Sequence, residues 1–158
     1  MDIDWSHEIA DQLDQHWQER LRARLEGLTA AEYVWEPVRD CWTIARRMAH
    51  ITVHVLAKRA EMYFGGTPVD YDTYLYAGTA AEALDRLDRA YDSWSTGLRA
   101  STAADLARPC GPDSGSFAGR PLAAVALHVH REVFHHGAEI SLLRDLYPKA
   151  GVPSLHRG

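Results

Sequence analysis

The sequence predicts an all-α protein, a four-helix bundle, and three observations support this. Apolar residues recur at helical spacing over four long stretches, roughly residues 5–26, 43–64, 79–99 and 121–147. The alternation of apolar and polar residues that is typical of strands is nearly absent from the sequence. Glycines, prolines and capping residues stand at the ends of the four stretches. The 158 residues are enough for one domain, so we expect residues 1–158 to form one bundle.

The first long stretch carries one apolar stripe and a clear end. Its apolar residues return at every fourth position, and Gly27 follows the last of them. Thr29 and Glu32 then form a Thr-x-x-Glu capping box, which predicts a short helix. Pro37 ends that helix, and the segment from there to Trp42 is expected to be a loop with aromatic anchors.

The second and third stretches have equally clear boundaries. The second helix is predicted to begin near Thr43 and to end at Phe64, because two glycines and a proline follow. Thr79 and Glu82 predict another capping box, from which the third helix continues to about Arg99.

A long break separates the third helix from the fourth. It covers residues 101–120, with a short helical turn expected near residues 102–106. Pro121 suits the first position of a helix, and Pro148 lies just beyond the end of the last one. The fourth helix is therefore predicted over residues 121–147.

Composition and charge exclude several classes of protein. The net charge of −5 argues against a nucleic-acid-binding protein, which usually has a basic balance or a basic stripe. No run of about 18 apolar residues is available to span a membrane, and the acidic N-terminus has no apolar signal region. Two distant cysteines are too few for a disulfide framework. We therefore expect a cytoplasmic protein that binds neither nucleic acid nor a membrane.

Acidic and imidazole side chains lie on the apolar face of the fourth helix. At about 100° per residue, His136 lies about 40° from Glu132, inside the apolar arc. Glu139 lies at the edge of this arc and His135 on its flank, whereas His130 is about 160° away and is expected to point from the core. A carboxylate that faces a core is strongly disfavoured unless it is paired or bound to a metal.

Glu132 and His136 are one helical turn apart and can therefore reach the same ion. Neutral imidazole and carboxylate are good ligands for zinc and other divalent first-row metals. An ion pair, either between these two residues or with Arg46 or Arg47, explains the same pattern about equally well. Spacing alone does not decide between these two interpretations.

A metal site would need a third ligand from a facing helix. Arg46, His50, His54 and Glu61 form a narrow polar stripe on the second helix. On periodicity alone we favour a solvated face for this stripe, which is the usual case for an amphipathic helix. His16 in the first helix is likewise interpreted as a surface residue.

Three short motifs occur together along the chain. They are Trp-Glu-Pro at 35–37 followed by Trp42, Met-Ala-His at 48–50, and Arg-Glu-Val-Phe-His-His at 131–136 ahead of Leu-Leu-Arg-Asp-Leu at 142–146. Together they resemble the DinB-like (DinB/YfiT) superfamily of four-helix-bundle proteins, in its actinobacterial type. The likeness covers about residues 5–147.

The resemblance implies a divalent metal, zinc or nickel, held by one residue of the second helix and two of the fourth. It implies that His50 is the ligand from the second helix. Many members use His-x-x-x-His on the fourth helix, which would make His135 a ligand, but Arg131 stands four positions before it. The chain looks closer to the branch containing mycothiol-dependent maleylpyruvate isomerase, where an Arg-Glu-Val-aromatic-x-His segment supplies the ligands. The ligand set carried over from that branch is His50, Glu132 and His136.

The same branch implies a function. It suggests an S-transferase or isomerase that depends on mycothiol or another low-molecular-weight thiol, with the metal stabilising the thiolate. Glu139 is then expected to orient a ligand or to move a proton. The substrate is expected to be a small molecule, and Arg46 is expected to contact an anionic group of it.

Two other functions remain open at this point. One is a non-catalytic, stress-associated binding protein of the same superfamily, with a degenerate or structural metal site. The other is hydrolysis of an amide or ester by metal-activated water. The resemblance also implies a homodimer, for which the tryptophans and the tyrosine-rich segment 71–76 could supply an interface.

Overall fold

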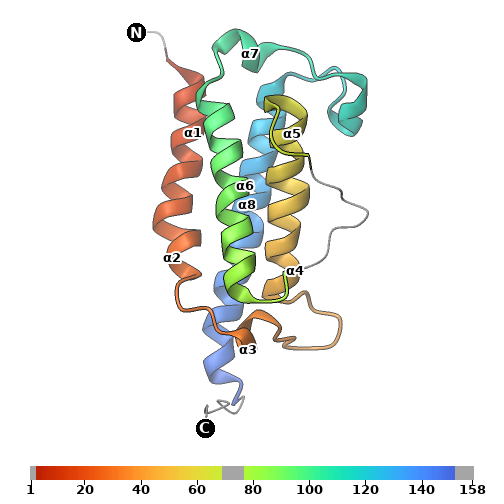
Figure 1. Ribbon diagram of the computed structural model, residues 1–158. Coiled ribbons are helices and arrows are strands. Elements are labelled where there is room, and N and C mark those ends of the chain that lie inside the picture. The colour runs from red at the N-terminus through yellow and green to blue at the C-terminus, as the bar shows by residue number, and fades with distance from the viewer. Residues whose placement is uncertain (1–2, 69–76, 152–158) are drawn as a thin grey trace.

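The computed structural model describes residues 3–68 and 77–151, and their regular secondary structure is helical apart from a β-bridge between Pro109 and Pro121. Long helical segments lie side by side along the molecule (Figure 1). The all-α class is therefore confirmed for the described residues. The tyrosine-rich segment 71–76 lies outside them.

The first helical segment is continuous but changes its winding. It consists of α1 (Trp5–His16), the π-helical segment η1 (Trp17–Leu21) and α2 (Arg22–Arg24). Most of the expected stripe is buried, but Trp5 at its start is 58% exposed. Gly27 adopts a φ of 66°, a left-handed conformation that glycine reaches without strain, so the chain turns there as expected.

The short helix α3 (Ala30–Tyr33) begins with the predicted capping box. The Thr29 side chain accepts from Glu32 N, and the Glu32 carboxylate accepts from Thr29 N. The following residues, up to Trp42, form the expected loop. This loop brings Trp42 to the start of the second long segment.

The second segment also contains a π-helical stretch. It runs through α4 (Ile44–Ala49), η2 (His50–Ala57) and α5 (Lys58–Phe64), and the Thr43 side chain caps it by accepting from Arg46 N. Gly65 follows with a φ of 70° and ends the helix. Because η2 winds more widely than an α-helix, side chains after His50 depart from the ordinary helical wheel.

The third long helix, α6 (Ala80–Arg99), begins with half of the predicted capping box. The Thr79 side chain accepts from Glu82 N, but the Glu82 carboxylate accepts from Gly78 N, at 3.1 Å. Two short helices, α7 (Ala103–Ala107) and η3 (Pro112–Phe117), then occupy the predicted break.

The last long helix is α8 (Leu122–Leu146), followed by the turn η4 (Tyr147–Lys149). Pro121 caps α8 from just outside it, so the predicted start is early by one residue. Helix α8 packs against both η2 and α1, and it therefore has two buried faces. Among the residues described, no helix is long and apolar enough to span a membrane.

The second buried face of α8 overturns two sequence-based expectations. His130 was expected to point away from the core, but it is only 6% exposed. Its Nδ1 lies 2.7 Å from the Ala126 carbonyl oxygen, and its Nε2 lies 2.6 Å from that of Ile9 in α1. His16 is also half-buried, with its ring 4.3 Å from that of Phe134. The wheel failed for His130 because it assigned the apolar face of α8 to one neighbour only, and His16 lies on the side of α1 that packs against α8.

Candidate metal centre

Three ligating side chains converge where the start of η2 faces the middle of α8. One ligand atom from each of His50, Glu132 and His136 lies within 4.8 Å of the other two. His50 is the first residue of η2, and the other two are one turn apart on α8. His136 is buried, and His50 and Glu132 are half-buried. The structure thus brings together the three residues that the resemblance implied as ligands.

Glu132 is about equally distant from the two imidazoles. Its Oε2 is 3.8 Å from His50 Nε2 and 3.7 Å from His136 Nε2, and both distances are longer than a hydrogen bond. Two ligands of a tetrahedral zinc ion, with bonds of about 2.1 Å, are separated by about 3.4 Å. The spacing is therefore close to what one ion between the three groups requires. The residues fit a divalent metal in both chemistry and spacing.

His50 is held in the form that binds metals. Burial lowers its pKa, the charges of His136 and His54 lower it further, and Glu132 opposes them only in part. Neutral imidazole is the ligand form, so His50 is available near neutral pH without first losing a proton.

A tryptophan from the loop before α4 packs over the two histidines. The Trp42 ring lies parallel to that of His136, with a centroid distance of 5.9 Å and an interplanar angle of 10°. The same indole meets His50 edge-on at 5.8 Å. Trp42 therefore shields the imidazoles from water and restricts their rotation.

The outer nitrogen of His136 is hydrogen-bonded to Glu139, one turn further along α8. His136 Nδ1 lies 2.7 Å from Glu139 Oε2, and Arg47 Nε donates to the same oxygen at 2.8 Å. Burial of Glu139 raises its pKa, but the bonds from Arg47 and His136 outweigh this effect and lower it. An ionised carboxylate only accepts, so Nδ1 carries a proton, and in the neutral ring Nε2 keeps its lone pair for a metal.

A second group of ligating side chains, His135, His136 and Glu139, shares one imidazole with the first. His135 is 64% exposed, and the Arg47 guanidinium already occupies the Glu139 carboxylate. A cation there would be repelled by Arg47, so this group is much less suited to a metal. The geometry therefore favours His136 over His135.

The chain matches a known protein family over most of its length. The family model described as the DinB superfamily matches residues 12–140. The chain belongs to the DinB superfamily. Neither the curated proteins nor the solved structures contain a match to it. The matched range contains His50, Glu132 and His136, so the cluster is part of the DinB domain itself.

The other predicted residues of this DinB domain surround the cluster. Arg46 is exposed, and its guanidinium carbon lies 4.2 Å from the centre of the Trp42 ring, at the edge of the site. His54 is exposed, with its ring 5.7 Å from that of His50. The polar stripe of the second helix is thus solvated in part, but its member His50 lies against α8.

Sequence reasoning missed two residues of the site. Arg47 was considered only as part of an ion pair that competes with metal binding, and Trp42 only as part of a motif and as an aromatic anchor of its loop. The spacing held a signal for the first, because Arg47 and His50 are three residues apart and share a helix face. The position of Trp42 depends on the loop and had no comparable signal.

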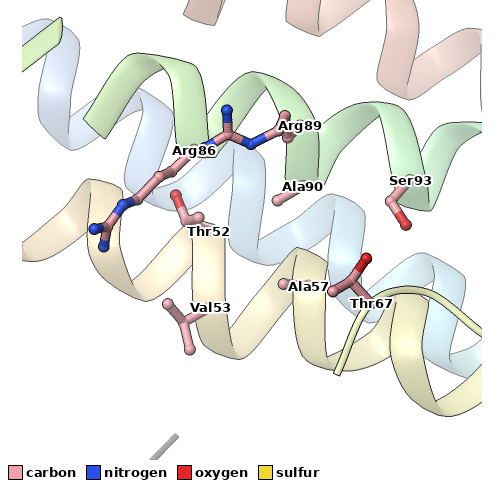
Figure 2. A pocket seen from close by; sticks show the side chains of 8 residues that line it. All are labelled: Thr52, Val53, Ala57, Thr67, Arg86, Arg89, Ala90 and Ser93. Atoms are coloured by element: carbon pink, nitrogen blue, oxygen red, sulfur yellow. The ribbon is translucent and has the colours of Figure 1, made fainter. Parts of the chain in front are cut away.

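A hollow of about 290 Å³ lies away from this cluster, between η2 and α6. Figure 2 shows its lining residues, which are Thr52, Val53, Ala57, Thr67, Arg86, Arg89, Ala90 and Ser93. Both arginines pair with acids of α6, namely Glu82 and Asp85. The lining residues that the structure describes include no His, Cys, Asp or Glu, so these residues offer neither a metal site nor a group for proton transfer near neutral pH.

Proposed function

We propose that this DinB-superfamily protein binds one divalent metal ion, zinc or nickel, through His50, Glu132 and His136. We further propose that it is an S-transferase or isomerase that uses mycothiol or another low-molecular-weight thiol. The observation that carries the proposal is the convergence of three ligand atoms within 4.8 Å of one another. Ion pairing alone does not require this convergence, because neither His50 nor His136 is within hydrogen-bond distance of Glu132.

The charge of the ligand set supports a thiol as the co-substrate. Two neutral imidazoles and one carboxylate leave a divalent cation with a net positive charge, which favours an anionic fourth ligand. When bound, the metal would supply a Lewis acid with an open position, at which a thiol is stabilised as its thiolate nucleophile.

The surrounding residues then have distinct parts in the proposed reaction. Trp42 excludes water from the side of the imidazoles that it covers. Arg46, exposed beside that indole, is positioned to contact an anionic group of the thiol or substrate. Glu139 holds the proton of His136 Nδ1 and orients the ring. Because Arg47 and His136 already occupy Glu139, it is poorly placed as a general base, and this argues against metal-assisted hydrolysis.

Metal analysis tests the first half of the proposal. The wild type should contain about one zinc or nickel ion per chain, and His50→Ala, Glu132→Gln and His136→Ala should each lose most of it. His135→Ala is the matched control, since it removes the exposed neighbouring imidazole, and it should keep the metal. Equal metal in all five proteins would refute the site, and loss in His135→Ala alone would move it to the other register.

Thiol transfer tests the second half. The metal-loaded protein should accelerate conjugation of mycothiol with a soft electrophile, chelation should abolish the acceleration, and added zinc or nickel should restore it. Arg46→Ala should raise KM for an anionic substrate with little change in kcat. Full metal occupancy without turnover of mycothiol, bacillithiol or glutathione would favour the non-catalytic binding protein.

A further inference from the structure

Arg47 is a buried arginine that the proposed ligand set does not use. It lies on α4 three residues before His50, and only 8% of its surface is exposed. Its Nε donates to Glu139 Oε2 at 2.8 Å, and its Nη1 donates to the carbonyl oxygen of Trp42. Burying a guanidinium is unfavourable unless its donors are satisfied, so these bonds are needed to hold it there.

These bonds join Arg47 on α4 to two other parts of the chain, which are α8 and the loop before α4. Through Glu139, Arg47 reaches α8 across 92 positions of sequence. Through the Trp42 carbonyl, it holds the end of the loop whose indole covers the two imidazoles. The planar guanidinium has separate donors in a fixed fork, which suits it to hold both acceptors at once.

The chain of bonds ends on a proposed metal ligand. Glu139 Oε2 accepts both from Arg47 and from His136 Nδ1. The ring of a neutral histidine carries one proton, and the bond at one nitrogen decides which nitrogen is free. Arg47 holds the Glu139 carboxylate in place beside His136, and that carboxylate, as an acceptor, favours the His136 proton on Nδ1.

We infer that Arg47 is a positioning residue of this site, which acts through Glu139 to hold His136 with Nε2 free and through Trp42 to hold the cover over the cluster. The inference rests on the proposed function, because holding Nε2 of His136 free serves metal binding. The effect on the His136 tautomer, however, exists whether or not a metal binds. The two ideas can therefore fail separately.

The direct test measures the tautomer of His136 in metal-free protein. Ring ¹⁵N chemical shifts, at a pH of about 8 where histidine is neutral, distinguish Nδ1–H from Nε2–H. The wild type should show His136 as Nδ1–H. Arg47→Met, which keeps an unbranched apolar stem but removes the donors, should move a large part of the population to Nε2–H. Glu139→Ala should do the same.

A second variant covers the case in which Arg47→Met does not fold. Arg47→Lys retains a buried cation, but its single ammonium lacks the separate Nε and Nη1 donors. It should show a smaller shift towards Nε2–H. A wild-type His136 in the Nε2–H form, or a folded Arg47 variant with the wild-type tautomer, would overturn the inference.

Arg144, a half-buried arginine with several acceptors, provides a control for the loss of an arginine side chain. Its side chain is 16% exposed, it pairs with Glu32 at 3.4 Å, and its Nη1 donates to the carbonyl oxygens of Arg24 and Glu26. It lies on α8 two turns beyond His136, so Arg144→Met should destabilise the fold without changing the His136 tautomer. If Arg144→Met changes the tautomer of His136 as much as Arg47→Met does, the effect of Arg47 comes from a general loosening of the fold and not from positioning His136.

Metal affinity connects the inference to the proposed function. Loss of an outer partner of a ligating histidine typically weakens metal binding by about 10–100-fold. We expect this loss for zinc in Arg47→Met and in Glu139→Ala, measured by competition with a chelator. The double variant should lose hardly more than Arg47→Met alone, because Arg47 acts on His136 only through Glu139, whereas Glu139→Ala leaves the bond from Arg47 to Trp42 intact. If the wild type binds no metal, the proposed function fails, and the tautomer still tests Arg47.

Discussion

Asp14 on α1 is surrounded by donors from α6. Tyr91 OH and the Arg99 guanidinium donate to it, and Ser95 Oγ donates at 3.0 Å. Burial of Asp14 raises its pKa, but the hydrogen bonds from Tyr91, Arg99 and Ser95 outweigh burial, so the pKa is lowered. Burial raises the pKa of Tyr91, and its hydrogen bond to Asp14 raises that pKa further. Asp14 therefore links α1 to α6 in its ionised form.

Replacing Asp14 should make the protein less stable in a pH-dependent way. A carboxyl group with a lowered folded pKa stabilises the fold above its unfolded pKa, of about 3.9, and this contribution is lost as the pH falls through the folded value. Asp14→Asn should therefore lower the free energy of unfolding at about pH 7 by about 1–3 kcal/mol. The difference from the wild type should shrink as the pH approaches about 3, as measured by urea unfolding.

Asp11 gives a close control for this prediction. It accepts from Arg99 Nη2 at 2.7 Å, but its side chain is 61% exposed, against 25% for Asp14. Exposed pairs of this kind contribute about 0–1 kcal/mol. If Asp11→Asn lowers the stability as much as Asp14→Asn does, burial of the carboxylate is not the cause.

At the scale of the elements, the sequence predicts where helices begin and end better than it predicts which way their side chains face. The ends depend on local chemistry, such as the Thr29 capping box and the left-handed Gly65, and both are found where they were expected. The facing of His50 could not be predicted in the same way, because the wheel placed it in one polar stripe with His54 and Glu61, and the π-helical winding of η2 displaces these later residues relative to it. A wheel with a constant angle per residue has no means of including such a change.

One close contact between elements gives a prediction about packing. Gly97 on α6 lies against Phe64 of α5, and a Cβ at this position would be 2.3 Å from the ring. Glycine inside a helix is normally less stable than alanine by about 1 kcal/mol. Here Gly97→Ala should instead destabilise the protein, by about 1–3 kcal/mol, because the ring has to move. Thermal unfolding would measure the change.

A second substitution identifies the cause. In the background of Phe64→Leu, where the ring is absent, Gly97→Ala should cost much less or should even stabilise the helix. An equal loss in both backgrounds would mean that the contact with Phe64 is not what requires the glycine.

At the scale of the whole molecule, the candidate metal centre depends on contacts between distant parts of the sequence. His50 and His136 are separated by most of the chain, and the spacing between Glu132 and His136 within one helix was the only part of the cluster that periodicity could predict. The third member came from resemblance to a family. Arg47 and Trp42 were not predicted, because their roles depend on how α4 and its preceding loop meet α8.

An ion at the cluster would join η2 to α8, so its binding should stabilise the fold as a whole. At a free zinc concentration about 100 times Kd, the stabilisation is about 2.7 kcal/mol if the unfolded chain binds none. For a domain of this size, that corresponds to a rise in Tm of about 5–10 °C. Calorimetry should show this rise for the wild type and for His135→Ala, whose side chain lies outside the ligand set. His50→Ala should show no rise, because η2 then has no ligand facing α8. A rise in His50→Ala equal to that of the wild type would mean that zinc stabilises the protein from another place.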